Sequence, residues 1–155
     1  MQSDHGFTLI ELVVMMTIIG ILAVSAIPQC FAPETFDASG FRDQAASALR
    51  YARTVAMASE CPVLFSRSGN SFNLSHPAAG AACPAATLNG PDGVPFTATA
   101  ASGVTFSGAA GVTFNPDGSA SADADFIVQG GGFNPGGAPG ISISVIAATG
   151  YVQVN

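Results

Sequence analysis

The sequence contains no lysine and no tryptophan, and charged residues make up only 9% of its 155 positions. Its basic residues are four arginines, Arg42, Arg50, Arg53 and Arg67, and the net charge is −6. A chain with so few cations has no basic face with which to neutralise phosphates. The composition therefore disfavours nucleic-acid binding, and it also disfavours tight adhesion to anionic lipid headgroups.

Catalytic motifs are also missing. The two histidines are His5, near the N-terminus, and His76, which precedes a proline. The sequence has no G-x-S-x-G, H-E-x-x-H or Walker motif, and the glycines at 130–132 lack the strand-then-helix setting of a phosphate loop. No C-x-x-C pair suggests zinc. We therefore expect neither enzymatic activity nor a cofactor.

Hydrophobic residues are concentrated at the start of the chain. The run from Phe7 to Ile27 contains one charge, Glu11. As a helix it would be about 31 Å long, enough to cross the hydrocarbon core of a bilayer. A cleaved signal peptide fits less well, because its apolar region is usually only about 7–15 residues long. An ordinary membrane anchor explains the length of the run but not the acid.

Glu11 sets this segment apart from a plain anchor. A carboxylate within a membrane span costs about 3 kcal/mol even on insertion scales, so it needs a partner. If the chain were cut after Gly6, the new amino group of Phe7 would lie about one helical turn from Glu11. It could meet the carboxylate of its own chain or that of a neighbouring copy. Such a helix is suited to align with copies of itself.

The segment Gly6-Phe7-Thr8-Leu9-Ile10-Glu11 matches the signature of type IV prepilins at every position. Gly20 and Pro28 also fall where that family usually has a glycine and a proline. The leader differs from many members in carrying Asp4 and His5 instead of basic residues, which weakens the orientation signal. The chain thus resembles type IV pilins in its N-terminal helix.

This resemblance implies a maturation pathway. A prepilin peptidase would cut between Gly6 and Phe7, and the new N-terminal Phe7 would be N-methylated. Glu11 would then serve filament assembly by pairing with the N-terminus of a neighbouring subunit. The implied organisation is a leader at 1–6, a transmembrane and filament-core helix at 7–27, and a periplasmic globular domain at 28–155.

The apolar run is followed by a second helical pattern. Pro28 and Pro33 predict a kink or a short non-helical stretch that ends near Ala38. A helix is then expected over about 38–60, capped by Asp37 or Ser39. Apolar residues recur in it at three- and four-residue spacing: Phe41, Ala45, Ala48, Leu49, Ala52, Val55 and Ala56. Cys61 and Pro62 should end the helix.

From about residue 62 to residue 155 the pattern is that of β-strands. The expected strands are Pro62–Arg67, Ser71–Ser75, Val104–Phe106, Val112–Phe114, Phe126–Gln129, Ile141–Ile146 and Tyr151–Val154. Two stretches rich in Gly, Ala and Pro, at 77–95 and 130–140, are predicted to be loops. The predicted fold is α+β: a long N-terminal helix, kinked near Pro28, whose second half packs on an antiparallel β-sheet. An edge strand or the loop at 77–95 could provide subunit contacts.

The three cysteines are typical of an exported protein. Cys61 lies at the expected helix end and Cys83 in the following loop. A disulfide between them would close a loop of about 20 residues and stabilise the fold by about 3 kcal/mol. The periplasm permits such a bond. Cys30 is left over, and we expect it to be buried instead of paired between subunits.

A cluster of oxygen-bearing side chains is a weak candidate for a Ca²⁺ site. Asn115, Asp117, Ser119, Asp123 and Asp125 fall within eleven residues. Ca²⁺ takes six to eight oxygen ligands, but the spacing is not that of an EF-hand and no glutamate closes the loop. We interpret the cluster as a solvated acidic hairpin.

Two further segments indicate a subtype. Residues 48–58 with the following Pro62-Val63 resemble the helix end of minor pilins of the H-type pseudopilin and fimbrial T-type group, and residues 148–152 resemble its closing Thr-Gly hairpin. Cys61 directly after the helix resembles minor pilins of mannose-sensitive haemagglutinin pili. DNA-binding members carry arginines beside that hairpin. Here Tyr151 and Gln153 occupy the region, which argues against DNA uptake.

We therefore expect a structural subunit, minor in preference to major, of a type IV pilus or a type II secretion pseudopilus. Its partners would be other pilin subunits, the prepilin peptidase and, before assembly, inner-membrane lipid. The alternative is a membrane-tethered periplasmic binding module that does not polymerise. Glu11 separates the two, since only a filament subunit should depend on it for assembly.

Overall fold

The computed structural model describes residues 8–30, 33–130 and 140–155. The chain divides into two units, Met1–Ala32 and Pro33–Asn155, and each is considered by itself. Helix α1 (Leu9–Cys30) belongs to the first unit. Gly6 and Phe7, the expected cleavage and methylation residues, lie outside the described residues, as does most of the expected loop at 130–140.

The side chains of α1 that the structure describes are exposed, and nearly all of them are apolar. Thr8 lies just before the helix, where its hydroxyl accepts a hydrogen bond from the amide of Glu11 (3.3 Å) in the manner of an N-cap. No helix in the part of the chain that the structure describes is long and apolar enough to cross a membrane.

The expected break between the helices is shorter than predicted. α1 continues through Pro28 to Cys30, and helix α2 (Pro33–Ser59) begins at Pro33 instead of near Ala38. Proline is well tolerated at the first helical position, because the amide hydrogen that it lacks would have no partner there. Pro28 falls in the last turn of α1. There it removes one backbone hydrogen bond, but the helix still continues to Cys30. A kink near Pro28 stays a prediction.

α2 is amphipathic, as its sequence spacing predicts. One face is buried and consists largely of small residues: Ala38, Phe41, Ala45, Ala46, Ala48, Leu49, Ala52 and Ala56. Alanines allow the helix to approach the strands closely. Glu60 has a left-handed backbone (φ 55°) directly after the helix, and Pro62 follows it. The predicted helix end is confirmed.

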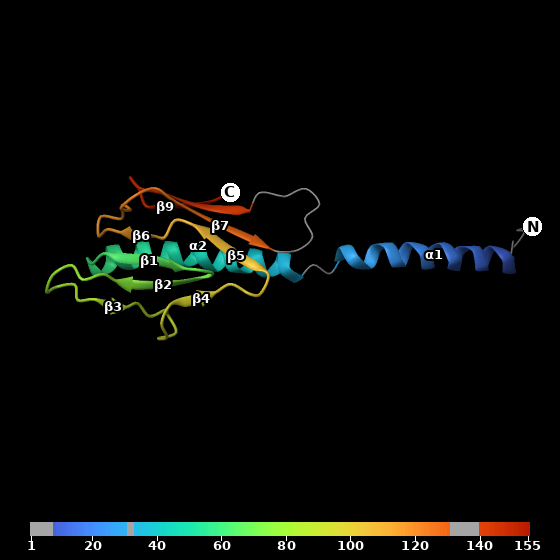
Figure 1. The fold of residues 1–155 in the computed structure, drawn as a ribbon, viewed down its shortest axis with the longest axis horizontal. Helices are drawn as coiled ribbons and strands as arrows, with labels where there is room; N and C mark the ends of the chain where they lie inside the picture. The colour runs from blue at the N-terminus through green and yellow to red at the C-terminus, as the bar shows by residue number, and fades with distance from the viewer. Residues whose placement is uncertain (1–7, 31–32, 131–139) are drawn as a thin grey trace, which may run out of the picture. The chain divides into compact units, whose positions relative to one another are not determined.

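Two antiparallel sheets pack against α2, where we had expected one (Figure 1). The first contains β1 (Val63–Ser68), β2 (Ser71–His76), β3 (Ala86–Thr87), β4 (Thr97–Thr99) and β6 (Gly111–Phe114). Its order is β3-β2-β1-β6, and β4 also pairs with β2. The second contains β5 (Val104–Gly108), β7 (Ala124–Gly130), β8 (Ile141–Ile146) and β9 (Tyr151–Val154), in the order β5-β7-β8-β9.

A cluster of phenylalanine rings joins α2 to both sheets. Phe41 of α2 lies 5.8 Å from Phe72 of β2 and 5.2 Å from Phe106 of β5, measured between ring centroids. Phe65 of β1 is 5.1 Å from Phe126 of β7. These are favourable distances for aromatic pairs, and the rings are buried. The helix and both sheets therefore share one core.

The segment expected to be a loop at 77–95 is partly ordered by pairing and by a covalent bond. β3 pairs with β2, and Asn89 forms a bridge with Pro95. Cys61 and Cys83 form the predicted disulfide, with Cα atoms 5.7 Å apart, and it ties this segment to the end of α2. β3 and the following β4 were missed because two or three residues among alanines and threonines show no apolar alternation.

Candidate functional site

Glu11 is an exposed acid on an otherwise apolar surface of α1. Arg42 and Asp43 form the one ion pair present among the described residues, so Glu11 pairs with none of them. The assembly role expected for Glu11 stays a prediction.

The acidic residues proposed for Ca²⁺ do not converge. Asp117 accepts hydrogen bonds from the hydroxyl (2.6 Å) and the amide (2.9 Å) of Ser119, which together lower the pKa of its carboxyl. Asp123 instead accepts from the amide of Ala147 (2.6 Å). Within the described ranges, no group of three or more Asp, Glu, His or Cys side chains is placed to hold a metal ion. The carboxylates of Asp117 and Asp123 thus hold the backbone of turns in place through hydrogen bonds.

His76 also has a structural role. Its Nδ1 lies 3.0 Å from the carbonyl oxygen of Pro62, which fixes Nδ1 as the protonated nitrogen if the ring is neutral. The ring thereby joins the end of β2 to the residue before β1. A histidine held in this way is not an obvious general base.

The last hairpin borders a groove with two arginines in it. The groove has a volume of about 280 Å³. Its lining comes from one face of α2 and from the start of β9: Arg50, Arg53, Thr54, Gly150, Tyr151 and Val152. Nε of Arg53 donates a hydrogen bond to the carbonyl oxygen of Gly118 (3.1 Å). We call this the α2–β9 groove.

The α2–β9 groove corrects an expectation from the sequence. Reading the residues around Tyr151 and Gln153, we expected no arginine beside the last hairpin. Arg50 and Arg53 lie about a hundred positions earlier in the chain, and only the packing of α2 against β9 brings them there. The spacing of three residues, which places both on one helical face, was the available signal.

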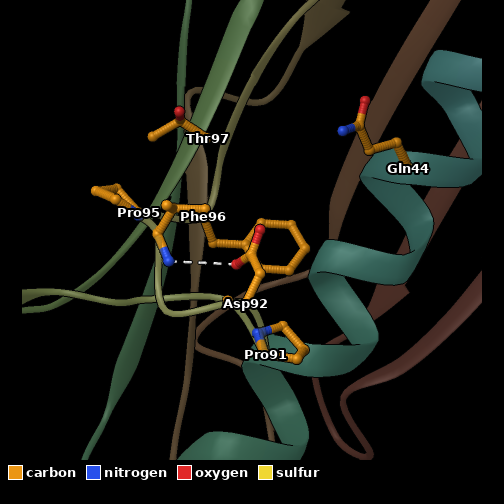
Figure 2. Close-up of a pocket in the computed structure, with 8 residues that line it drawn as sticks. Gln44, Pro91, Asp92, Pro95, Phe96 and Thr97 are labelled. Carbon is orange, nitrogen blue, oxygen red and sulfur yellow. Dashed lines mark hydrogen bonds between the residues drawn. The ribbon is translucent and has the colours of Figure 1, made fainter.

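A second pocket, of about 340 Å³, lies between α2 and the segment at 90–97. Figure 2 shows Gln44 on α2 and, across from it, Pro95, Phe96 and Thr97. Pro91 and Asp92 of the same segment also line the pocket. Asp92 accepts a hydrogen bond from the amide of Val94 (3.3 Å), and Tyr51 stacks on Phe96 at 5.3 Å. Asp92 is the one ionisable side chain in the lining, and it accepts a hydrogen bond from the backbone of its own loop.

Comparison with protein families gives two matches. The model of the prokaryotic N-terminal methylation motif matches residues 1–27, and the model of type II transport protein GspH matches residues 42–149. These matches confirm the resemblance to type IV prepilins at the N-terminus and the resemblance to H-type pseudopilins in the globular domain. No curated protein matches the chain.

Solved structures share the fold. The type IV minor pilin FimU of Pseudomonas aeruginosa is 17% identical, with a TM-score of 0.58 over 79% of this chain and 90% of FimU. The minor pseudopilin EpsH of the Vibrio cholerae type 2 secretion system is 12% identical, with a TM-score of 0.54 over 78% of this chain and 94% of EpsH. At these identities the likeness establishes a pilin fold.

Proposed function

The chain belongs to the family of type II transport protein GspH, and on this basis we propose that it is a minor pilin or pseudopilin. It would be a structural subunit of a type IV pilus or of the pseudopilus of a type II secretion system. The methylation motif at residues 1–27 supports this function, and so does the pilin fold of the globular unit.

Maturation and anchoring follow from the same proposal. A prepilin peptidase cuts between Gly6 and Phe7, and the amino group of Phe7 is methylated. Before assembly, Phe7–Ile27 holds the subunit in the bacterial inner membrane and the globular unit lies in the periplasm. The apolar surface of α1 supports this, because a helix that is hydrophobic all round is normally buried in lipid or protein. The disulfide suits the periplasm.

The observation that carries the proposal is the exposed Glu11 on α1, which forms no ion pair with any residue that the structure describes. In the filament, α1 helices pack side by side, so burial against neighbours replaces burial in lipid. A carboxylate on such a surface is costly unless a cation meets it. The methylated amino group of a neighbouring Phe7 is that cation.

The test is Glu11→Ala in cells that assemble the filament. We expect the amount of subunit in sheared filaments to fall about tenfold or more, because an unpaired amino group is then buried in the filament core. The amount in the membrane should stay unchanged. Asp43→Ala is the control, since it removes an exposed acid whose ion pair contributes little.

Three results would contradict the proposal. Normal incorporation of the Glu11→Ala subunit would mean that Glu11 does not serve assembly. Absence of the unaltered subunit from sheared filaments would indicate a tethered periplasmic module. An intact mass corresponding to a chain that starts at Met1, in cells with active prepilin peptidase, would exclude the maturation step.

A further inference from the structure

The four arginines of the globular unit differ in what they bind. Arg42 is paired with Asp43 at 2.7 Å, and Arg67 donates to backbone carbonyl groups. Arg53 makes one hydrogen bond, to a carbonyl oxygen, and no described acid lies within ion-pair distance of Arg50 or Arg53. In a chain with ten acids and four arginines, the α2–β9 groove therefore concentrates positive charge that its own carboxylates leave uncompensated.

β9 lies at the edge of its sheet and borders the same groove through Tyr151 and Val152. Ser142 and Asn155 exchange both backbone hydrogen bonds, so this pair and every second pair after it are the bonded ones. With Ile143 opposite Val154 and Val145 opposite Val152, the amide and carbonyl groups of Val152 and Val154 point away from β8. No described residue bonds to them.

Two other sheet edges, those of β5 and β6, are covered by the chain itself. Asn70 donates to the carbonyl oxygen of Val104 and accepts from the amide of Phe106, which covers the outer edge of β5. The outer edge of β6 is covered by Ser121, which exchanges hydrogen bonds with Thr113. Natural proteins cover edges in this way to avoid unwanted pairing, so an open edge is a place where another strand can add.

Val152 links the two arginines to the open strand edge. It lines the groove with Arg50 and Arg53, and its backbone groups point away from β8. Tyr151 beside it is 55% exposed, which leaves an aromatic surface available for contact. An extended chain lying along β9 would pass directly beside Arg50 and Arg53.

We propose that the α2–β9 groove binds an extended, acidic segment of a neighbouring protein subunit as an additional strand on β9. Main-chain hydrogen bonds to Val152 and Val154 would provide binding, and carboxylates of the segment near Arg50 and Arg53 would provide specificity. Only the identification of the partner as a subunit rests on the proposed function. The net charge of −6 disfavours a nucleic acid, whose affinity depends on many phosphate contacts.

The proposal can be tested on the purified full-length protein in neutral detergent. The probe is a short peptide of alternating threonine and glutamate, followed by NMR of backbone amides. We expect saturable binding that weakens with salt, and hydrogen exchange at the Val152 and Val154 amides that slows about tenfold or more when peptide is bound. The same peptide with lysine in place of glutamate should not bind.

Matched variants locate the site. Arg50→Glu should weaken peptide binding about tenfold or more, since it replaces attraction by repulsion. Arg42→Glu makes the same change of charge on the same helix and should leave binding unchanged. Val154→Pro removes an outward amide without touching the ladder to β8, and should also weaken binding.

Several outcomes would overturn the proposal: no binding at millimolar peptide, equal binding of the lysine peptide, equal loss in Arg42→Glu and Arg50→Glu, or unchanged exchange at Val152 and Val154. Tighter binding of a single-stranded oligonucleotide at the same salt concentration would assign the groove to nucleic acid instead. Because the assay needs no filament, it can succeed even if the unaltered chain proves to be absent from filaments.

Discussion

Gly150 lies in the last hairpin, close to Arg53 of α2 and to the carbonyl oxygen of Gly118. Its φ is +59°, and a methyl group there would overlap the carbonyl oxygen of Gly118 and lie 3.2 Å from Nε of Arg53. A side chain at position 150 would therefore crowd the hydrogen bond that Arg53 donates to Gly118. This gives a physical reason for the Thr-Gly sequence that was recognised only as a resemblance.

Gly69 offers a matched control for Gly150. Its φ is nearly the same, +58°, but a methyl group there would meet nothing within 4 Å. Gly69→Ala should thus cost only the strain of the left-handed backbone, about 1–2 kcal/mol of unfolding free energy. Gly150→Ala should cost about 3 kcal/mol, since overpacking adds to that strain. Urea unfolding of both variants measures the difference, and equal losses would show that the contact with Gly118 and Arg53 is unimportant.

The stability of the folded protein in acid should depend on the hydrogen bonds that Ser119 donates to Asp117. The Ser119 hydroxyl, and then its amide, hold the pKa of Asp117 below its ordinary value of 3.8 in the folded protein. Ionised Asp117 therefore stabilises the fold above the unfolded pKa, and this contribution is lost as pH falls through the lower folded pKa. NMR titration should show a midpoint below 3.8, and Ser119→Ala should move it upward. An unchanged midpoint would mean that the hydroxyl has no such effect.

Among the elements, the hairpin of β1 and β2 holds the two sheets together. Nε of Arg67 donates to the carbonyl oxygen of Ala109 (2.9 Å), and its terminal nitrogens donate to those of Gly108 (3.0 Å) and Phe106 (3.4 Å). These carbonyls belong to β5 and to the segment that leads from β5 into the other sheet. Arg67 thus satisfies backbone groups at the seam between the sheets.

Replacing Arg67 by Met keeps much of the aliphatic stem but removes every one of these donors. We expect a loss of about 2–3 kcal/mol in unfolding free energy, because hydrogen bonds from a charged donor are lost and partly buried carbonyls are left unpaired. Arg42→Met, which removes an ion pair with the exposed Asp43, should cost less than about 1 kcal/mol. Similar losses in the two variants, measured by urea unfolding, would exclude a special role for Arg67.

Strands with clear alternation could be predicted from the sequence, and the path of the chain between them could not. Ile141–Ile146 and Tyr151–Val154 were predicted with the bounds that the structure shows. Val104–Phe106 and Val112–Phe114 were also recognised as strands, but β5 and β6 belong to different sheets. Alternation specifies which face of a strand is buried, and it says nothing about which strand lies beside it.

At the scale of the molecule, the N-terminal motif was predictable because its chemistry is local. Glu11 and the residues before it lie within one short segment. The α2–β9 groove was not predictable, since Arg50 and Tyr151 meet only after α2 packs across both sheets. The same holds for Asn70, whose side chain covers the edge of a strand more than thirty positions away.

The described core lies wholly in the unit Pro33–Asn155, so this unit should fold without the residues before it. We expect a chain starting at Pro33 to unfold cooperatively in urea, with the free energy of the full-length protein in detergent. A chain starting at Ala46 is the control. It lacks Ala38, Phe41 and Ala45, and the loss of the Phe41 ring alone should cost about 3–5 kcal/mol. If the longer piece were instead as unstable as the shorter one, residues before Pro33 would contribute to the core.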